Sequence, residues 1–159
     1  MNFISYKQSP LYDRVVEEYD IFEHSYDFMV FLAVLGYRED NPVRDGYEGS
    51  ESEGTRGQIG ADNFFSNELY QVIAACIAYQ DTGDRSALVD RELQAERLTQ
   101  YAAGGLEIAE EEFGSIAGDP TDAIANRVLH YEEQNKANEG ILGEIKKDFS
   151  DNMLGLEQQ

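Results

Sequence analysis

The chain has 159 residues with one cysteine, and its 32 acidic residues face only 12 lysines and arginines, for a formal net charge of −20. This length suits one domain with a sizeable core, and a single cysteine excludes an internal disulfide. The negative field opposes direct binding to DNA phosphates and to anionic membranes, so neither partner is expected.

The amino-terminal residues 1–10 carry few helix signals and are predicted to form a short irregular arm. Pro10 after Ser9 favours a helix start, because proline fits the first helical position. Apolar residues then recur at helical spacing to about Asp20. These residues are Leu11, Val15, Val16 and Tyr19.

Residues 22–37, FEHSYDFMVFLAVLGY, contain the longest uncharged apolar run of the chain. A helix that is apolar on every side has to be enclosed by the rest of the protein. The run Phe28–Leu35 is too short for a bilayer, which needs roughly 20 residues. We predict the buried central helix here, closed by Gly36 in a left-handed conformation.

Residues 38–57, REDNPVRDGYEGSESEGTRG, are rich in glycine and charge and predict a long acidic loop. Loops of this length are uncommon unless they are functional or disordered, so a flexible connector and a loop ordered by a partner are both open. The following residues 58–65 predict a short extended or docking segment.

Helices are predicted over residues 66–80, 91–113 and 119–136. Gly83 is placed to end the first, and Asp90 to cap the second. Gly104 and Gly105 interrupt the second, which predicts either a kink or a close helix crossing. Apolar residues recur at near-helical spacing in the polar tail and predict a terminal amphipathic helix, although no heptad array is evident.

The resulting fold class is all-α, a compact bundle of about five helices. Two parts are expected: a single helical domain over residues 1–137 and an amphipathic tail or helix over residues 138–159. The tail is expected to pack either on the body of the protein or on another chain.

The sequence contains no recognisable catalytic motif, so no catalytic, cofactor-binding or metal-binding residue is predicted. His130 and Glu133 share a helix face, but di-iron bundles use Glu-x-x-His twice, and here the order is reversed and no second copy is present. Glu144-Ile145-Lys146 has the Glu-x-Lys pattern of some nucleases, but it lies in a predicted helix. Cys76 falls in the apolar run VIAACIAY, which favours a buried, inert thiol.

Partner binding is expected in the loop and in the tail. The residues predicted to contact a partner are Arg44, Tyr47, Ile141, Ile145, Phe149 and Met153.

Four stretches of the chain carry a resemblance to a known family. They are IFEHSYDFMVFLAVLGYRED, QIGADNFF, IAACIAYQDTGDRSALVD and RLTQYAAGGLEIAEEEF, and the resemblance as a whole covers roughly residues 11–117. In these stretches the chain resembles dnd system-associated protein 4, an accessory family encoded beside DNA phosphorothioation and restriction systems. The resemblance implies association with such a defence system and supplies no catalytic residue.

We therefore expect a non-enzymatic accessory or adaptor protein that contacts the proteins of a DNA sulphur-modification system. The alternatives are an acidic DNA mimic that inhibits a DNA-binding component, and a metal-dependent hydrolase or nuclease. The acidity is consistent either with a salt-rich cytoplasm, as in a haloarchaeon, or with a docking surface for a basic partner. A cytoplasmic location is expected because residues 1–10 lack the features of a signal peptide.

Overall fold

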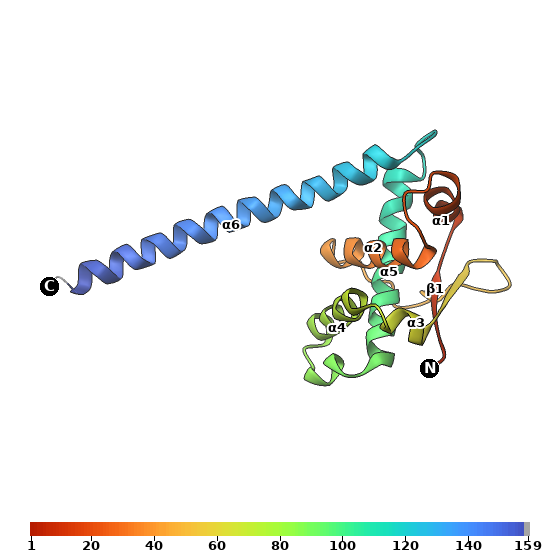
Figure 1. The fold of residues 1–159 in the computed structure, drawn as a ribbon, viewed down its shortest axis with the longest axis horizontal. Helices are drawn as coiled ribbons and strands as arrows, with labels where there is room; N and C mark the ends of the chain where they lie inside the picture. The colour runs from red at the N-terminus through yellow and green to blue at the C-terminus, as the bar shows by residue number, and fades with distance from the viewer. Residues whose placement is uncertain (158–159) are drawn as a thin grey trace. The chain divides into compact units, whose positions relative to one another are not determined.

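The protein is mostly helical in its computed structural model, which describes residues 1–157 (Figure 1). Contacts divide the chain into two units, Met1–Asp119 and the part from Pro120 onward, and each is described by itself. The elements in chain order are β1 (Phe3–Lys7), α1 (Pro10–Asp13), the π-helical turn η1 (Arg14–Glu18), α2 (Ser25–Arg38), β2 (Arg56–Gly60), α3 (Ala61–Phe65), α4 (Glu68–Thr82), the 3₁₀ turn η2 (Arg85–Leu88), α5 (Arg91–Phe113) and α6 (Thr121–Glu157).

Helix α2 forms the buried centre of the first unit, as predicted. The side chains of Phe28, Met29 and Leu32 are 0% exposed. Burying a side chain of this size contributes roughly 1.5–3 kcal/mol. The principal partner of α2 is α5, and the two helices cross in Figure 1.

Glycines allow the backbones of α2 and α5 to touch. A Cβ on Gly36 would stand 2.1 Å from the carbonyl oxygen of Tyr101, and one on Gly105 would stand 1.8 Å from that of Leu32. A close helix crossing is therefore the role of Gly105 in α5. The prediction that Gly36 ends α2 is wrong, because the helix continues to Arg38 and needs a residue without a side chain at this contact.

A small antiparallel sheet corrects the all-α prediction. β1 pairs with β2 in a register that places Ile4 opposite Ile59 and Tyr6 opposite Gly57. A Cβ on Gly57 would lie 2.4 Å from the Tyr6 ring, so the glycine makes room for that side chain. Residues 1–10 were wrongly predicted to be irregular, because their strand depends on a partner distant in sequence.

The extended segment predicted over residues 58–65 is only partly present. Strand β2 ends at Gly60, and α3 occupies Ala61–Phe65. The two aromatic side chains of α3, Phe64 and Phe65, are buried and anchor it to the core.

Local capping predictions are confirmed at several helix ends. Ser9 accepts a hydrogen bond from the Leu11 amide ahead of Pro10, and the Asp90 side chain accepts one from the Leu93 amide. Gly83 closes α4 with a φ of 68°. These caps depend on neighbouring residues alone, which explains why they can be predicted from the sequence.

The second unit contains one long helix. α6 runs without interruption for 37 residues and does not end near Lys136. The predicted boundary between residues 137 and 138 falls inside α6 and stays a prediction.

Candidate protein-interaction surfaces

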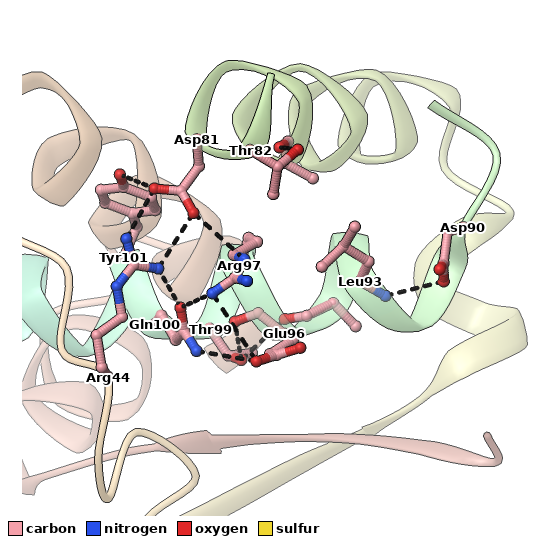
Figure 2. Close-up of polar contacts among 12 residues, drawn as sticks. Arg44, Asp81, Thr82, Asp90, Leu93, Glu96, Arg97, Thr99, Gln100 and Tyr101 are labelled. Carbon is pink, nitrogen blue, oxygen red and sulfur yellow. Dashed lines mark hydrogen bonds and ion pairs between the residues drawn. The ribbon is translucent and has the colours of Figure 1, made fainter. Parts of the chain in front are cut away.

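A polar cluster in the first unit surrounds Asp81, at the end of α4 (Figure 2). Arg44 Nη2 donates to Asp81 Oδ1 at 2.8 Å, and Arg44 Nη1 donates to Oδ2 at 3.1 Å. The Tyr101 hydroxyl donates to Oδ1 at 2.6 Å, and Arg97 Nε lies 3.2 Å from Oδ2. Arg44 Nη1 also donates to Gln100 Oε1. We call Arg44, Asp81, Arg97, Gln100 and Tyr101 the Asp81 cluster.

The electrostatics of the Asp81 cluster favour its present charge state. Hydrogen bonds from Arg44 hold the pKa of Asp81 below its usual range, although partial burial opposes this shift. Burial and the hydrogen bond to Asp81 raise the pKa of Tyr101 to about 12. At neutral pH the cluster therefore contains an ionised carboxylate and a neutral phenol.

The Asp81 cluster joins three segments and does not resemble a catalytic site. Arg44 comes from the connection between α2 and β2, Asp81 from α4, and Arg97 from α5. The Asp81 side chain is only 9% exposed, and both of its oxygens already accept contacts. A carboxylate occupied in this way holds elements together and is poorly placed to accept a substrate proton.

The connection over residues 39–55 is ordered by its own chain. The Asn41 amide donates to the Gly36 carbonyl at 2.9 Å, and Asn41 Nδ2 donates to the Gly104 carbonyl at 3.0 Å. The Val43 amide donates to the Gln100 carbonyl at 3.0 Å. A Cβ on Gly104 would lie 1.4 Å from the Asn41 carbonyl oxygen, so this glycine makes room for the connection.

The far end of the connection is tied to β1. The Lys7 amide donates to the Tyr47 carbonyl at 2.9 Å, and the Gln8 amide donates to the Thr55 carbonyl at 2.8 Å. Thr55 in turn donates its amide to the Ser50 carbonyl at 2.9 Å. The sequence left open a flexible connection or one ordered by a partner. Instead, hydrogen bonds within the chain itself order it.

Arg44 and Tyr47 lie near one another in sequence but differ in the contacts that their side chains make. The Arg44 guanidinium is bound within the Asp81 cluster, although 44% of its side chain remains exposed. Tyr47 is half-buried, and its burial raises the pKa of its hydroxyl. Its side chain lines a concave surface together with Phe3, Glu48 and Glu96. Their role in partner binding stays a prediction.

The four tail residues predicted to bind a partner are all exposed on α6. The exposed fractions are 56% for Ile141, 57% for Ile145, 67% for Phe149 and 50% for Met153. The heavy exposure of an apolar row on one helix is typical of a contact surface for another protein. These residues belong to the second unit, whereas Arg44 and Tyr47 belong to the first.

A second apolar surface lies on α4 and was not predicted. Leu69 is 64% exposed and Val72 is 57% exposed, and Cys76 follows one turn later on the same face. The prediction of a buried Cys76 is wrong, because α4 packs inward through Ala74, Ile77 and Ala78. The sequence showed that α4 is apolar on a wide face, but not which part of that face the core would cover.

No group of three or more histidine, cysteine, aspartate or glutamate side chains within residues 1–157 is arranged to hold a metal ion. None of the helices described there is both long enough and apolar enough to cross a membrane.

The family model for DNA sulphur modification system-associated protein 4 matches residues 7–147. No curated protein and no solved structure matches the chain.

Proposed function

The chain belongs to the family of DNA sulphur modification system-associated protein 4, and from this we propose that it is a non-enzymatic adaptor that contacts proteins of such a system. The match covers both the compact first unit and most of α6. Membership in the family connects the chain with DNA sulphur modification, and the adaptor role is the specific function that we propose within it.

The observation that carries this proposal is the exposure of apolar side chains on two helices. Leu69 and Val72 on α4, and Ile145 and Phe149 on α6, are each more than half exposed. Apolar rows of this kind mark protein contacts when they are framed by charged residues. The core of the first unit is formed by other side chains, so these exposed rows are not needed for it and are available to a second protein.

The net charge of −20 supports contacts with proteins in preference to DNA. A duplex carries a dense row of phosphates and is repelled by such a surface. A partner with a basic patch around an apolar centre would instead be attracted, and salt would weaken that long-range attraction.

Co-expression with the proteins of the DNA sulphur-modification system from the same genome tests the proposal. The tagged wild-type chain is expected to retain at least one of them after washing in concentrated KCl. Val72→Asp places a charge in the α4 surface and is expected to reduce recovery about tenfold or more, because desolvating a lone carboxylate opposes apolar contact.

Gln71→Asp is the matched control, since it adds the same side chain at a neighbouring exposed position of α4. Its recovery is expected to equal that of the wild type. If the wild type retained none of the system's proteins at any salt concentration, the adaptor proposal would be rejected.

A further inference from the structure

Helix α6 contains features that an isolated helix in water does not stabilise. It includes Gly140, Gly143 and Gly155, and around each of them there is nothing within 4 Å of an added Cβ. These glycines therefore serve no close contact in the structure, and each costs about 1 kcal/mol relative to alanine in a helix interior. Most helices of globular proteins owe their stability to the packing of an apolar face.

A seven-residue repeat can be followed along α6, with apolar residues at five of its eight a and d positions and asparagine at the other three. Its residues are separated alternately by three and four positions, which is the a/d spacing of a coiled coil. The repeat extends across the boundary between the two helices predicted from the sequence, so it requires the single continuous helix that α6 forms. The a and d residues are Val128, Tyr131, Asn135, Asn138, Leu142, Ile145, Phe149 and Asn152.

The order of polar and apolar residues in this repeat fits a second copy of the same helix. In a parallel, in-register pair, each a or d residue meets its own counterpart. Asn135 and Asn138 would then face asparagines, while Leu142, Ile145 and Phe149 would face apolar side chains. An asparagine at an a position, as at Asn135, is known to fix register and favour two strands.

Flanking residues support the same pairing. Ile141 and Met153 occupy g and e positions, where they widen the apolar seam, and both are at least half exposed. Arg127 at g would approach Glu132 at e of the second helix, an attraction between opposite charges. Glu132 already pairs with Lys136 of its own helix at 3.1 Å, so its carboxylate would lie between two cations.

We propose that α6 pairs with α6 of a second copy of the chain to form a parallel, two-stranded coiled coil. This pairing rests on the proposed function and refines it, because it would cover the α6 row with a second copy and leave the α4 surface for proteins of the modification system. The net charge of −20 per chain opposes the approach of two copies, so the dimer is expected to strengthen as salt screens this repulsion.

Sedimentation of the full chain in concentrated KCl tests the pairing. The wild type is expected to have twice the mass of one chain at micromolar concentration. Phe149→Asp places a charge at an a position and is expected to raise the dissociation constant at least about 100-fold. Ser150→Asp adds the same charge at the neighbouring outward b position and is expected to remain dimeric.

Cross-linking tests the orientation in a Cys76→Ser background, which removes the native thiol. Asn135→Cys is expected to form a disulfide between two chains, because a positions face one another in a parallel pair. Ala137→Cys, at an outward c position, is expected not to form one. Failure of Asn135→Cys to cross-link a dimer would overturn the parallel arrangement.

The inference fails if the wild type stays monomeric, or if Phe149→Asp remains as dimeric as Ser150→Asp. These outcomes are distinguishable from failure of the adaptor proposal. A monomer that still retains proteins of the modification system would rule out only the coiled-coil proposal. A dimer that retains none of these proteins would rule out only the adaptor proposal.

Discussion

Asp81 shows how a single residue links segments of the first unit that lie far apart in the sequence. Its carboxylate receives contacts from Arg44 in the connection, and from Arg97 and Tyr101 in α5. The helix end that carries it is visible in the sequence, but its three partners come from distant positions. Removing this charge leaves two arginines without their counter-charge, which costs more than the loss of one contact.

We predict that Asp81→Asn lowers the free energy of unfolding by about 1–3 kcal/mol at pH 7, because the Arg44 and Arg97 contacts lose their charge. Chemical unfolding in concentrated KCl measures the change. Glu111→Gln removes an exposed carboxylate from α5 and is expected to stay within about 0.5 kcal/mol of the wild type.

Comparison of the wild type with Asp81→Asn also gives a prediction about pH. Since the pKa of Asp81 is lowered in the folded state, its stabilisation is present above its ordinary pKa of about 3.9 and is lost as pH falls through the folded value. The stability difference between wild type and Asp81→Asn should therefore shrink below about pH 4. A difference that stays constant into this acid range would contradict the assignment.

Tyr101 gives the opposite dependence on pH. Its folded pKa is raised to about 12, so its stabilisation is complete below the ordinary tyrosine pKa of about 10 and is lost as pH rises through about 12. We expect Tyr101→Phe to be less stable than the wild type by about 1 kcal/mol at pH 8, because a hydrogen bond is lost.

Unfolding measured at pH 8 and at pH 11 tests the Tyr101 prediction. The deficit of Tyr101→Phe should become smaller at pH 11. Tyr79→Phe removes a tyrosine hydroxyl from α4 and is a suitable comparison for the substitution itself. An unchanged Tyr101→Phe deficit across this range would rule out the predicted coupling.

At the scale of elements, glycines distinguish the two long helices. Gly105 lies where the α5 backbone touches α2, while Gly143 in α6 has open space around it. The same residue type therefore has opposite consequences: at Gly105 a methyl group meets a carbonyl oxygen, and at Gly143 it meets only solvent. Sequence position inside a predicted helix does not separate these two cases.

We predict that Gly105→Ala destabilises the first unit by about 3 kcal/mol, because overpacking against backbone forces the helices apart. Gly143→Ala should instead increase helical circular dichroism, since alanine favours a helix interior by about 1 kcal/mol. Thermal melts followed at 222 nm measure both. If Gly105→Ala were as stable as the wild type, the backbones of α2 and α5 could not be in close contact at Gly105.

At the scale of the whole molecule, charge sets the conditions for stability. With a net charge of −20, repulsion between carboxylates opposes the compact state in dilute buffer. The screening length falls from about 10 Å at 0.1 M salt to about 3 Å at 1 M, so salt removes much of this penalty. This repulsion acts across the whole chain and involves no particular ion pair.

We predict that the melting temperature rises between 0.1 and 2 M KCl, with part of the structure lost in dilute buffer. Circular dichroism melts at several salt concentrations measure the effect. A variant combining Glu17→Gln, Glu111→Gln and Glu133→Gln carries less charge and should show a weaker salt dependence. Melting that does not respond to salt would contradict a repulsion-limited fold.

The sequence by itself determined the elements that depend on neighbouring residues. The apolar run of α2 required burial, Asp90 and Gly83 marked helix ends, and the acidic composition opposed DNA binding. Each of these follows from a local pattern or from a sum over the chain. The family resemblance also needed only the sequence, and the family match over residues 7–147 confirms it.

Only the tertiary structure decided which distant residues meet and which surfaces stay open. β1 exists because Arg56–Gly60 supplies its partner strand, and Gly36 lies inside α2, where the Tyr101 carbonyl leaves no room for a side chain. The exposure of Leu69 and Val72 depends on which side of α4 meets the core. The physical reason is common to all three: burial and pairing are properties of contacts between segments, and an isolated segment does not contain its partner.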